Sequence, residues 1–416
     1  MTLAILGGKP ARKESFPDWP VFSSEEETLL LGALRGGKWG GYGAEIRRFE
    51  ERFQQMHEVK HAISCANGTV ALEVALRSVG VRCGDEVVVT PFSFIASASA
   101  ILLCHAVPVF ADIDPNTLNI SPSAIEPVIT RRTKAIVVVH FGGHPAEMDA
   151  IVPLARKYGL AIVEDCAHAH GARWRGTAVG NFGDAGTFSF QGYKLATSGE
   201  GGVIVANDSN VAERAWSYCN QGRLREGGWY EHYSLGSNYR LTAFQAAVLC
   251  AQLERLSGQT ATRARNAAYL RSLLGNFNGI ETAEPSEHVE SNPHYLVILR
   301  YDPSAFSGIS REVFLEAVRA EGIPLSTVYP YPLYSNPLFE REKLEHAVCG
   351  AWASIPDYSA VHLEECERVC RDGLWFDHQM LLGDKRDMED IVEAFQKIQE
   401  NSSILAKHQE ELKAAL

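Results

Sequence analysis

Short apolar strands alternate with helical stretches between residues 60 and 210, and this alternation is the strongest constraint on the fold. The clearest expected strands are residues 86–90, 107–111, 135–139 and 160–163. Helical patterns lie between them, for example over residues 95–104 and 148–157. Such alternation is typical of parallel βαβ units, which cover both faces of a sheet with helices. The sequence therefore predicts an α/β fold.

The pattern changes in the second half of the chain. A long helix is expected over residues 242–256, after which a strand-like stretch covers residues 294–301. Helical patterns follow at residues 311–321 and 387–400. We therefore predict two domains: residues 1–259 form an N-terminal segment and a large cofactor-binding domain, and residues 260–416 form a small α+β domain.

Charge and cysteine usage restrict the partners and the compartment. The formal net charge is −12 and no basic block stands out, so neither nucleic acid nor an anionic membrane surface is an expected partner. The nine cysteines show no CxxC pair and no metal-ligand spacing, so no metal is predicted and a reducing, cytoplasmic location is expected. The N-terminus lacks the features of a signal peptide, and no apolar run approaches a membrane span.

Lys194 is the one lysine in an otherwise uncharged stretch that begins at Gly186 and is closed by a Gly-Glu-Gly-Gly turn at residues 199–202. Strand-like residues lie on both sides of this stretch. A lysine buried between two strands loses solvation, which lowers its pKa and makes its amine a better nucleophile toward carbonyls. Such an amine can hold an aldehyde cofactor as a Schiff base. The alternative for Lys194 alone is a solvated charge beside a glycine turn.

Two further sites fit an aldehyde cofactor that carries a phosphate. Asp165 ends an apolar strand, where ligands bind in parallel α/β sheets, and a carboxylate there would keep a pyridine nitrogen protonated. Residues 67–69, Asn-Gly-Thr, precede an apolar-periodic helix whose first N–H groups favour an anion. Each feature alone has a simpler explanation as a helix cap.

Five motifs in order resemble one family of enzymes. They are residues 67–72, 164–171, 188–194, 199–202 and 236–240. Together they are similar to the DegT/DnrJ/EryC1/StrS aminotransferases, over nearly the whole chain. The resemblance implies the fold-type I architecture of pyridoxal 5′-phosphate-dependent transferases, with a mostly parallel mixed sheet flanked by helices.

The resemblance also assigns residues to the cofactor. Lys194 would form the Schiff base and then move a proton as general base and acid. The other implied cofactor residues are Asp165 at the pyridine nitrogen, His168 and Phe94 at the ring, and Gly68, Thr69 and Ser189 at the phosphate. Asn238 would reach the phosphate of a neighbouring subunit, which implies a homodimer with shared active sites.

Residues 188–191, 222–223, 236–238 and 375–382 resemble more narrowly the cyclitol aminotransferase and 3-amino-5-hydroxybenzoate synthase-like branch. The substrate candidates are Tyr42, Tyr329 and His378, because aromatic groups and histidine suit a neutral polyhydroxy ring, with core or dimer packing as the alternative for each. In that branch a His-His pair usually precedes the Leu-Leu near residue 382, and Asp377 here stands in place of the first histidine.

The implied reaction is transfer of an amino group from L-glutamine or L-glutamate to a keto-cyclitol or keto-sugar, in antibiotic or cell-surface amino-sugar synthesis. The alternative is a pyridoxal phosphate-dependent dehydratase or lyase of the 3-amino-5-hydroxybenzoate synthase type. A third reading, a sensor without catalysis, is disfavoured because Lys194, Asp165 and the phosphate motif are all present.

Overall fold

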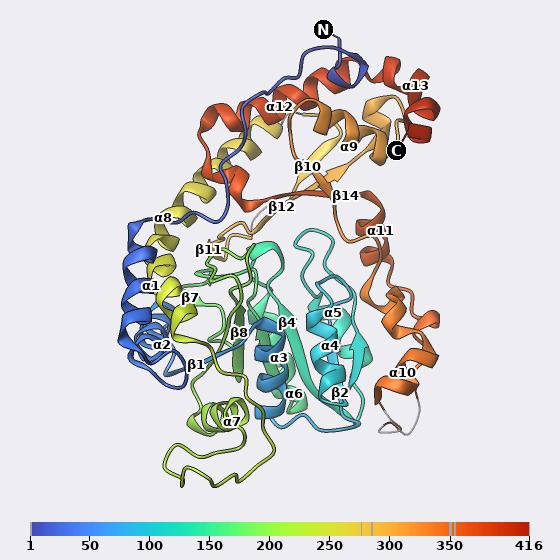
Figure 1. Cartoon of the computed structure of the whole chain (residues 1–416). Helices are drawn as coiled ribbons and strands as arrows, with labels where there is room; N and C mark the ends of the chain where they lie inside the picture. The colour runs from blue at the N-terminus through green and yellow to red at the C-terminus, as the bar shows by residue number, and fades with distance from the viewer. Residues whose placement is uncertain (1, 276, 284–285, 349–351, 353–354, 416) are drawn as a thin grey trace.

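A seven-stranded sheet forms the centre of the first half of the chain (Figure 1). The computed structural model describes residues 2–275, 277–283, 286–348, 352 and 355–415. The strands are β1 (His61–Cys65), β2 (Glu86–Val89), β3 (Val107–Phe110), β4 (Thr133–Val139), β5 (Ala161–Asp165), β8 (Ala185–Ser189) and β9 (Gly202–Ala206). They lie in the order β1-β9-β8-β5-β4-β2-β3.

Most neighbours in this sheet are parallel, and β9 runs antiparallel to both β1 and β8. The mixed, mostly parallel sheet confirms the predicted fold class. Register places Val139 beside Asp165, and Asp165 beside Thr187. The carboxyl ends of β4, β5 and β8 therefore meet at one edge, where ligands bind in α/β sheets.

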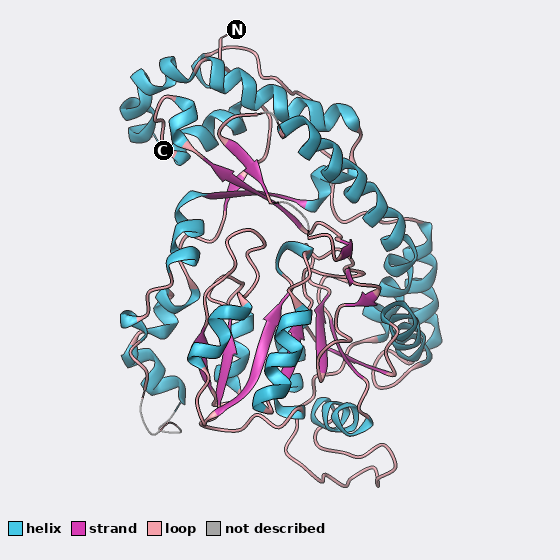
Figure 2. Ribbon diagram, turned by 180° about the vertical axis from the view of Figure 1, so that it is seen from behind, coloured by secondary structure: helices cyan, strands magenta, loops and turns pink. Residues whose placement is uncertain are grey.

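Helices cover both faces of the sheet, as its apolar strands require (Figure 2). Side chains alternate along β2, so Val87 and Val89 pack in one apolar cluster and Val88 packs in another. The helices of this half are α1 (Ser24–Gly36), α2 (Ala44–His57), α3 (Gly68–Ser78), α4 (Ala96–Leu103), α5 (Pro122–Ile125), α6 (Met148–Tyr158) and α7 (Ser209–Cys219). The expected helices at 95–104 and 148–157 are confirmed as α4 and α6.

Helix α8 (Ala243–Leu274) is much longer than the predicted helix over 242–256. Its start is fixed because the Thr242 side chain accepts from the Gln245 backbone, while the Gln245 side chain accepts from the Thr242 N–H. Its early residues, such as Leu249, pack beside the large sheet, and Leu270 packs in the C-terminal core. The helix therefore runs on because a second core buries its last turns.

A smaller antiparallel sheet forms the C-terminal core. Its strands are β10 (Ile280–Thr282), β12 (Leu296–Tyr301), β14 (Gly373–Asp377) and β13 (Ser326–Thr327), in that order. The helices of this half are α9 (Arg311–Ala320), α10 (Arg341–Val348), α11 (Glu364–Asp372), α12 (Lys385–Glu400) and α13 (Ser402–Ala415). A separate small sheet joins β11 (Val289–Ser291) to β6 (Arg173–Trp174) and β7 (Thr177–Ala178).

The predicted domain boundary at 259/260 lies inside α8. Leu3 packs in the C-terminal core, and both termini lie on that side of the molecule (Figure 1). In the other direction, Tyr334 and Cys366 pack onto the cluster of the large sheet. The division into two domains therefore stays a proposal. Among the described residues, no helix is both long and apolar enough to cross a membrane.

Candidate active site

A cavity of about 960 Å³ lies at the carboxyl ends of the central strands. Its volume is that of a small-molecule site. Most residues predicted for a site line it together: Gly68, Thr69, Phe94, Asp165, His168, Ser189, Lys194, Tyr329 and His378. Because these residues come from distant parts of the chain, their convergence is a property of the tertiary fold.

Lys194 lies in the turn between β8 and β9, with its backbone N–H donating to the Gln191 carbonyl at 2.8 Å. Burial lowers its pKa from 10.5 to about 8, although the charge of Asp165 opposes that shift. The lysine Nζ lies 4.6 Å from the centre of the Tyr295 ring. A substantial fraction of this amine is thus neutral near physiological pH, as a nucleophile or a general base requires.

Asp165 is the last residue of β5 and is 5% exposed. The Ser97 hydroxyl donates to its Oδ2 at 2.8 Å, and the Ala167 N–H donates to its Oδ1 at 3.2 Å. Burial raises the pKa of Asp165, while these two donors and the charge of Lys194 act in the opposite direction. Both hydrogen bonds present the carboxyl as an acceptor, so a protonated ring nitrogen in the cavity would find a matching partner.

The start of α3 lines one end of the cavity. The Asn67 side chain caps the helix by accepting from the Val70 N–H at 2.9 Å, and the Asn67 carbonyl accepts from Ala71. Those bonds leave the Gly68 and Thr69 N–H groups at the positive end of the helix dipole. A Cβ at Gly68 would lie 2.6 Å from the Cβ of Ser189, so glycine permits the close approach of the helix to β8.

Aromatic side chains form the walls around Lys194. His168 stacks on Tyr295 with ring centres 4.1 Å apart, and within the described chain its Nδ1 has no hydrogen-bond partner. Burial lowers the pKa of His168 far enough to keep its ring neutral. Phe94 is 58% exposed beside the cavity, as a residue that stacks on a bound ring would be. Tyr295 was not predicted, because the strand-like stretch around it carries no local motif.

His378 contacts the lysine turn itself. Its Nε2 donates to the Tyr193 carbonyl at 3.0 Å, and the Trp19 indole donates to the Gly192 carbonyl at 3.0 Å. The two rings meet edge to face, with centres 4.5 Å apart. A residue from each end of the chain thus holds the two carbonyls that precede Lys194. His378 was predicted to contact substrate. The structure places it in the cavity lining and also in contact with the Tyr193 carbonyl.

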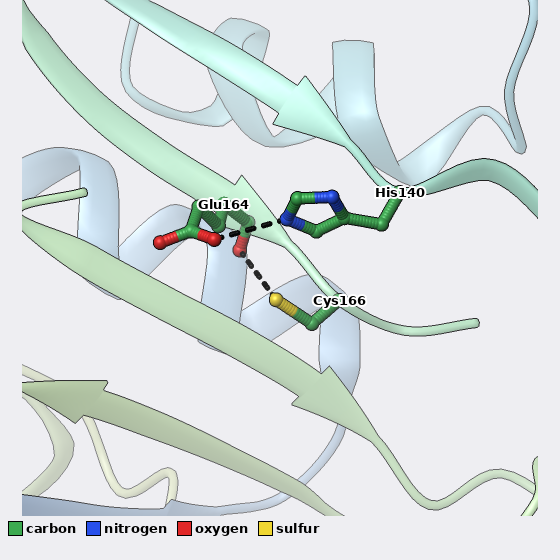
Figure 3. A group of neighbouring side chains, drawn as sticks. All are labelled: His140, Glu164 and Cys166. Carbon is green, nitrogen blue, oxygen red and sulfur yellow. Dashed lines mark hydrogen bonds and ion pairs between the residues drawn. The ribbon is translucent and has the colours of Figure 1, made fainter. Parts of the chain in front are cut away.

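His140, Glu164 and Cys166 form a buried group, in which Glu164 and Cys166 are the sequence neighbours of Asp165 (Figure 3). The His140 Nδ1 accepts from the Ala146 N–H, so its Nε2 is the protonated nitrogen and donates to Glu164 at 3.0 Å. The carboxylate of Glu164 also accepts from the backbone N–H groups of residues 180, 182 and 183. The lone pairs that could bind a metal are therefore engaged, and the group fixes β5 to the 180–183 loop.

Two predicted residues lie outside the cavity lining. The Tyr42 hydroxyl accepts from the Asn220 side chain at 2.7 Å, and its ring packs against Trp216. Asn238 is exposed and forms an isolated antiparallel bridge with Asn220. Within one chain, neither residue belongs with Lys194.

The solved structure of 3-amino-5-hydroxybenzoic acid (AHBA) synthase is similar to this fold, with a TM-score of 0.84 and 33% sequence identity. The match covers 94% of this chain and 99% of that one. The topology and the lysine–aspartate cavity together define a fold-type I enzyme of the aminotransferase class. The model of the DegT/DnrJ/EryC1/StrS aminotransferase family matches residues 21–372, and the chain belongs to this family.

Two relatives from Streptoalloteichus tenebrarius are similar over almost their full lengths. One is named for an L-glutamine:3-amino-2,3-dideoxy-scyllo-inosose aminotransferase activity and is 39% identical over 416 residues, covering 97% of this chain and 99% of the relative. The other, an L-glutamine:2-deoxy-scyllo-inosose aminotransferase, is 39% identical over 413 residues, covering 95% and 97%. The family resemblance found in the sequence is therefore confirmed.

Proposed function

We propose that this aminotransferase uses pyridoxal 5′-phosphate to move an amino group from L-glutamine to a keto-cyclitol of the scyllo-inosose type, in aminocyclitol antibiotic synthesis. The observation that supports this cofactor is that one cavity holds both a lysine of lowered pKa and a buried, hydrogen-bonded aspartate. The donor and the acceptor class are those named for the two relatives from Streptoalloteichus tenebrarius.

The residues present fit this cofactor at each of its ends. The Gly68 and Thr69 N–H groups and the Thr69 and Ser189 hydroxyls would hold its phosphate. Asp165, oriented by Ser97, would hold the ring nitrogen in its protonated form. His168 and Phe94 would lie against the ring. When bound, the cofactor supplies an electron sink that stabilises negative charge on the adjacent substrate carbon.

Lys194 performs the proton transfers in this proposal. With the cofactor bound, the Nζ of Lys194 would take the proton from the donor's α-carbon. In the second half of the reaction the same amine would return a proton to the acceptor carbon that was the ketone. Both roles need an amine that is neutral and protonated in turn near pH 8, which matches the lowered pKa of Lys194. Trp19 and His378 hold the preceding carbonyls, so the amine works from a fixed turn.

We also propose that the protein is a cytoplasmic homodimer. Asn238 is exposed and does not line the cavity of its own subunit, as expected of a residue that would contact the phosphate in the neighbouring subunit. Tyr42 would act, if at all, through the same interface. An Asn238→Ala variant should bind pyridoxal phosphate more weakly while its fold is unchanged. Unchanged affinity would contradict the cross-subunit role.

The decisive experiment follows the cofactor spectrum of the purified protein with pyridoxal phosphate. We expect the visible band of the lysine-bound cofactor, its loss on addition of L-glutamine, and its return when 2-deoxy-scyllo-inosose is added. Lys194→Ala should lack the band, and Lys60→Ala, which changes an exposed lysine, should keep it. A band that no amino donor discharges would favour the lyase alternative. A Lys194→Ala variant that still turns over would refute the lysine assignment.

A further inference from the structure

Asp377 and Glu200 are the two carboxylates in the cavity for which the proposed cofactor provides no partner, and Asp377 lies on its substrate side. Asp377 is the last residue of β14 and pairs with Leu296 of β12, so the small sheet carries it to the cavity wall. Neither a hydrogen bond nor an ion pair joins its side chain to any other part of the chain that the structure describes. The side chain is exposed at the end of β14 where it lines the cavity, so its charge is open to a ligand that enters there.

Asp377 lines the same cavity as Lys194 and Tyr295. Its negative charge contributes to the raised pKa of Tyr295, so Asp377 and Tyr295 are electrostatic neighbours. Tyr295 also lies close to Lys194, whose Nζ is 4.6 Å from the centre of the Tyr295 ring. A ring bound in this cavity would therefore lie between a wall that carries Asp377 and the amine of Lys194.

The charges that line the cavity favour a cation. They are Asp165, Lys194, Glu200 and Asp377, and no arginine lines the cavity among the described residues. Asp165 and Lys194 are committed to the cofactor in the proposed function. The two charges left for the substrate are both negative, so this lining repels a nucleotide diphosphate and attracts an ammonium group.

We propose, on the basis of the proposed function, that Asp377 binds an ammonium group on the cyclitol ring, so that the preferred acceptor is an already aminated ketone. The two relatives are named for acceptors with and without that amine, at the same 39% identity, so overall similarity does not choose between them. In this proposal the charge of Asp377 makes that choice, because it favours the aminated ketone. Asp377 is thus a specificity residue rather than one that moves a proton.

The test compares Asp377→Asn with the wild-type holoenzyme on two ketones, 3-amino-2,3-dideoxy-scyllo-inosose and 2-deoxy-scyllo-inosose. We expect wild type to prefer the amino ketone. The variant should lose about 10- to 100-fold in kcat/KM for the amino ketone, mainly through KM, as loss of a charged hydrogen bond implies. Its kcat/KM for the neutral ketone and its rate of reaction with L-glutamine should fall much less, so that the preference between the two ketones shifts by about 10-fold or more.

A binding measurement separates recognition from catalysis. Calorimetry on the apo-protein with a monoaminated cyclitol should show affinity that weakens with salt and falls in Asp377→Asn. Glu287→Gln removes the same net charge at a side chain that is 87% exposed and does not line the cavity, and it should behave as wild type.

The possible negative results of these experiments lead to different conclusions. Equal losses on both ketones would assign Asp377 a structural role and overturn the specificity inference, as would a wild-type preference for the neutral ketone. Both outcomes would leave the proposed function intact. If L-glutamine discharges the cofactor but neither ketone is aminated, the proposed acceptor class itself is wrong, and the inference falls with it.

Discussion

The pKa of Lys194 gives the sharpest test of how this site works, because its causes are few. Burial lowers the pKa from 10.5 to about 8, and the Asp165 carboxylate partly opposes that shift by stabilising the ammonium form. Replacing Asp165 by asparagine keeps the shape and an acceptor for Ser97 but removes the charge. We therefore predict that Asp165→Asn lowers the pKa of Lys194 further, below about 8.

The size of the effect follows from the two pKa values. At pH 7 an ordinary lysine with a pKa of 10.5 is neutral in about 0.03% of molecules, whereas a pKa of about 8 gives about 10%. The buried amine is thus roughly 300-fold richer in its reactive form. Removing Asp165's charge should increase that fraction further.

Competitive acetylation of the apo-protein, read by peptide mass spectrometry from pH 6 to 11, measures this directly. The labelling rate of Lys194 should rise with a midpoint near 8, and the exposed Lys60 in the same sample serves as the internal control for labelling. Asp165→Asn should move the Lys194 midpoint to lower pH. A Lys194 midpoint near the ordinary lysine value of 10.5, or an upward shift in the variant, would refute the reasoning.

Three further predictions concern stability and positioning. Because the folded pKa of Lys194 is depressed, the buried ammonium destabilises the apo-protein below pH 8, and this penalty disappears as pH rises from about 8 to 10.5. Urea unfolding at pH 7 should therefore find Lys194→Met more stable by up to about 3 kcal/mol, with the gain vanishing above pH 10. Trp19→Phe keeps the ring but loses the donor to Gly192, so amide hydrogen exchange should accelerate across residues 191–195 and not in β5. Glu164→Gln replaces an acceptor of several backbone N–H groups, and it should cost about 2–4 kcal/mol in urea melts, with Glu287→Gln unchanged.

Local patterns were sufficient for the parts of the fold that depend on local interactions. The apolar runs of β2, β4 and β5 and the helix start at Gly68 were predicted because strand and helix signals lie within a few residues. The end of α8 was missed. Its residues beyond Leu256 look polar in sequence, and they are helical because Leu270 and Leu274 pack in a core built from chain that comes later.

The sequence by itself determined which chemistry this protein carries: Lys194, Asp165 and the turn at Gly68 each sit in a local motif at a strand end or helix start. The tertiary structure alone decided what surrounds them. Ser97 contacts Asp165, Trp19 and His378 contact the lysine turn, and Asp377 lines the same cavity, each across a separation in sequence that no local motif encodes. The reason is physical, since burial and opposing charge set a pKa, and both exist only once distant segments have packed together.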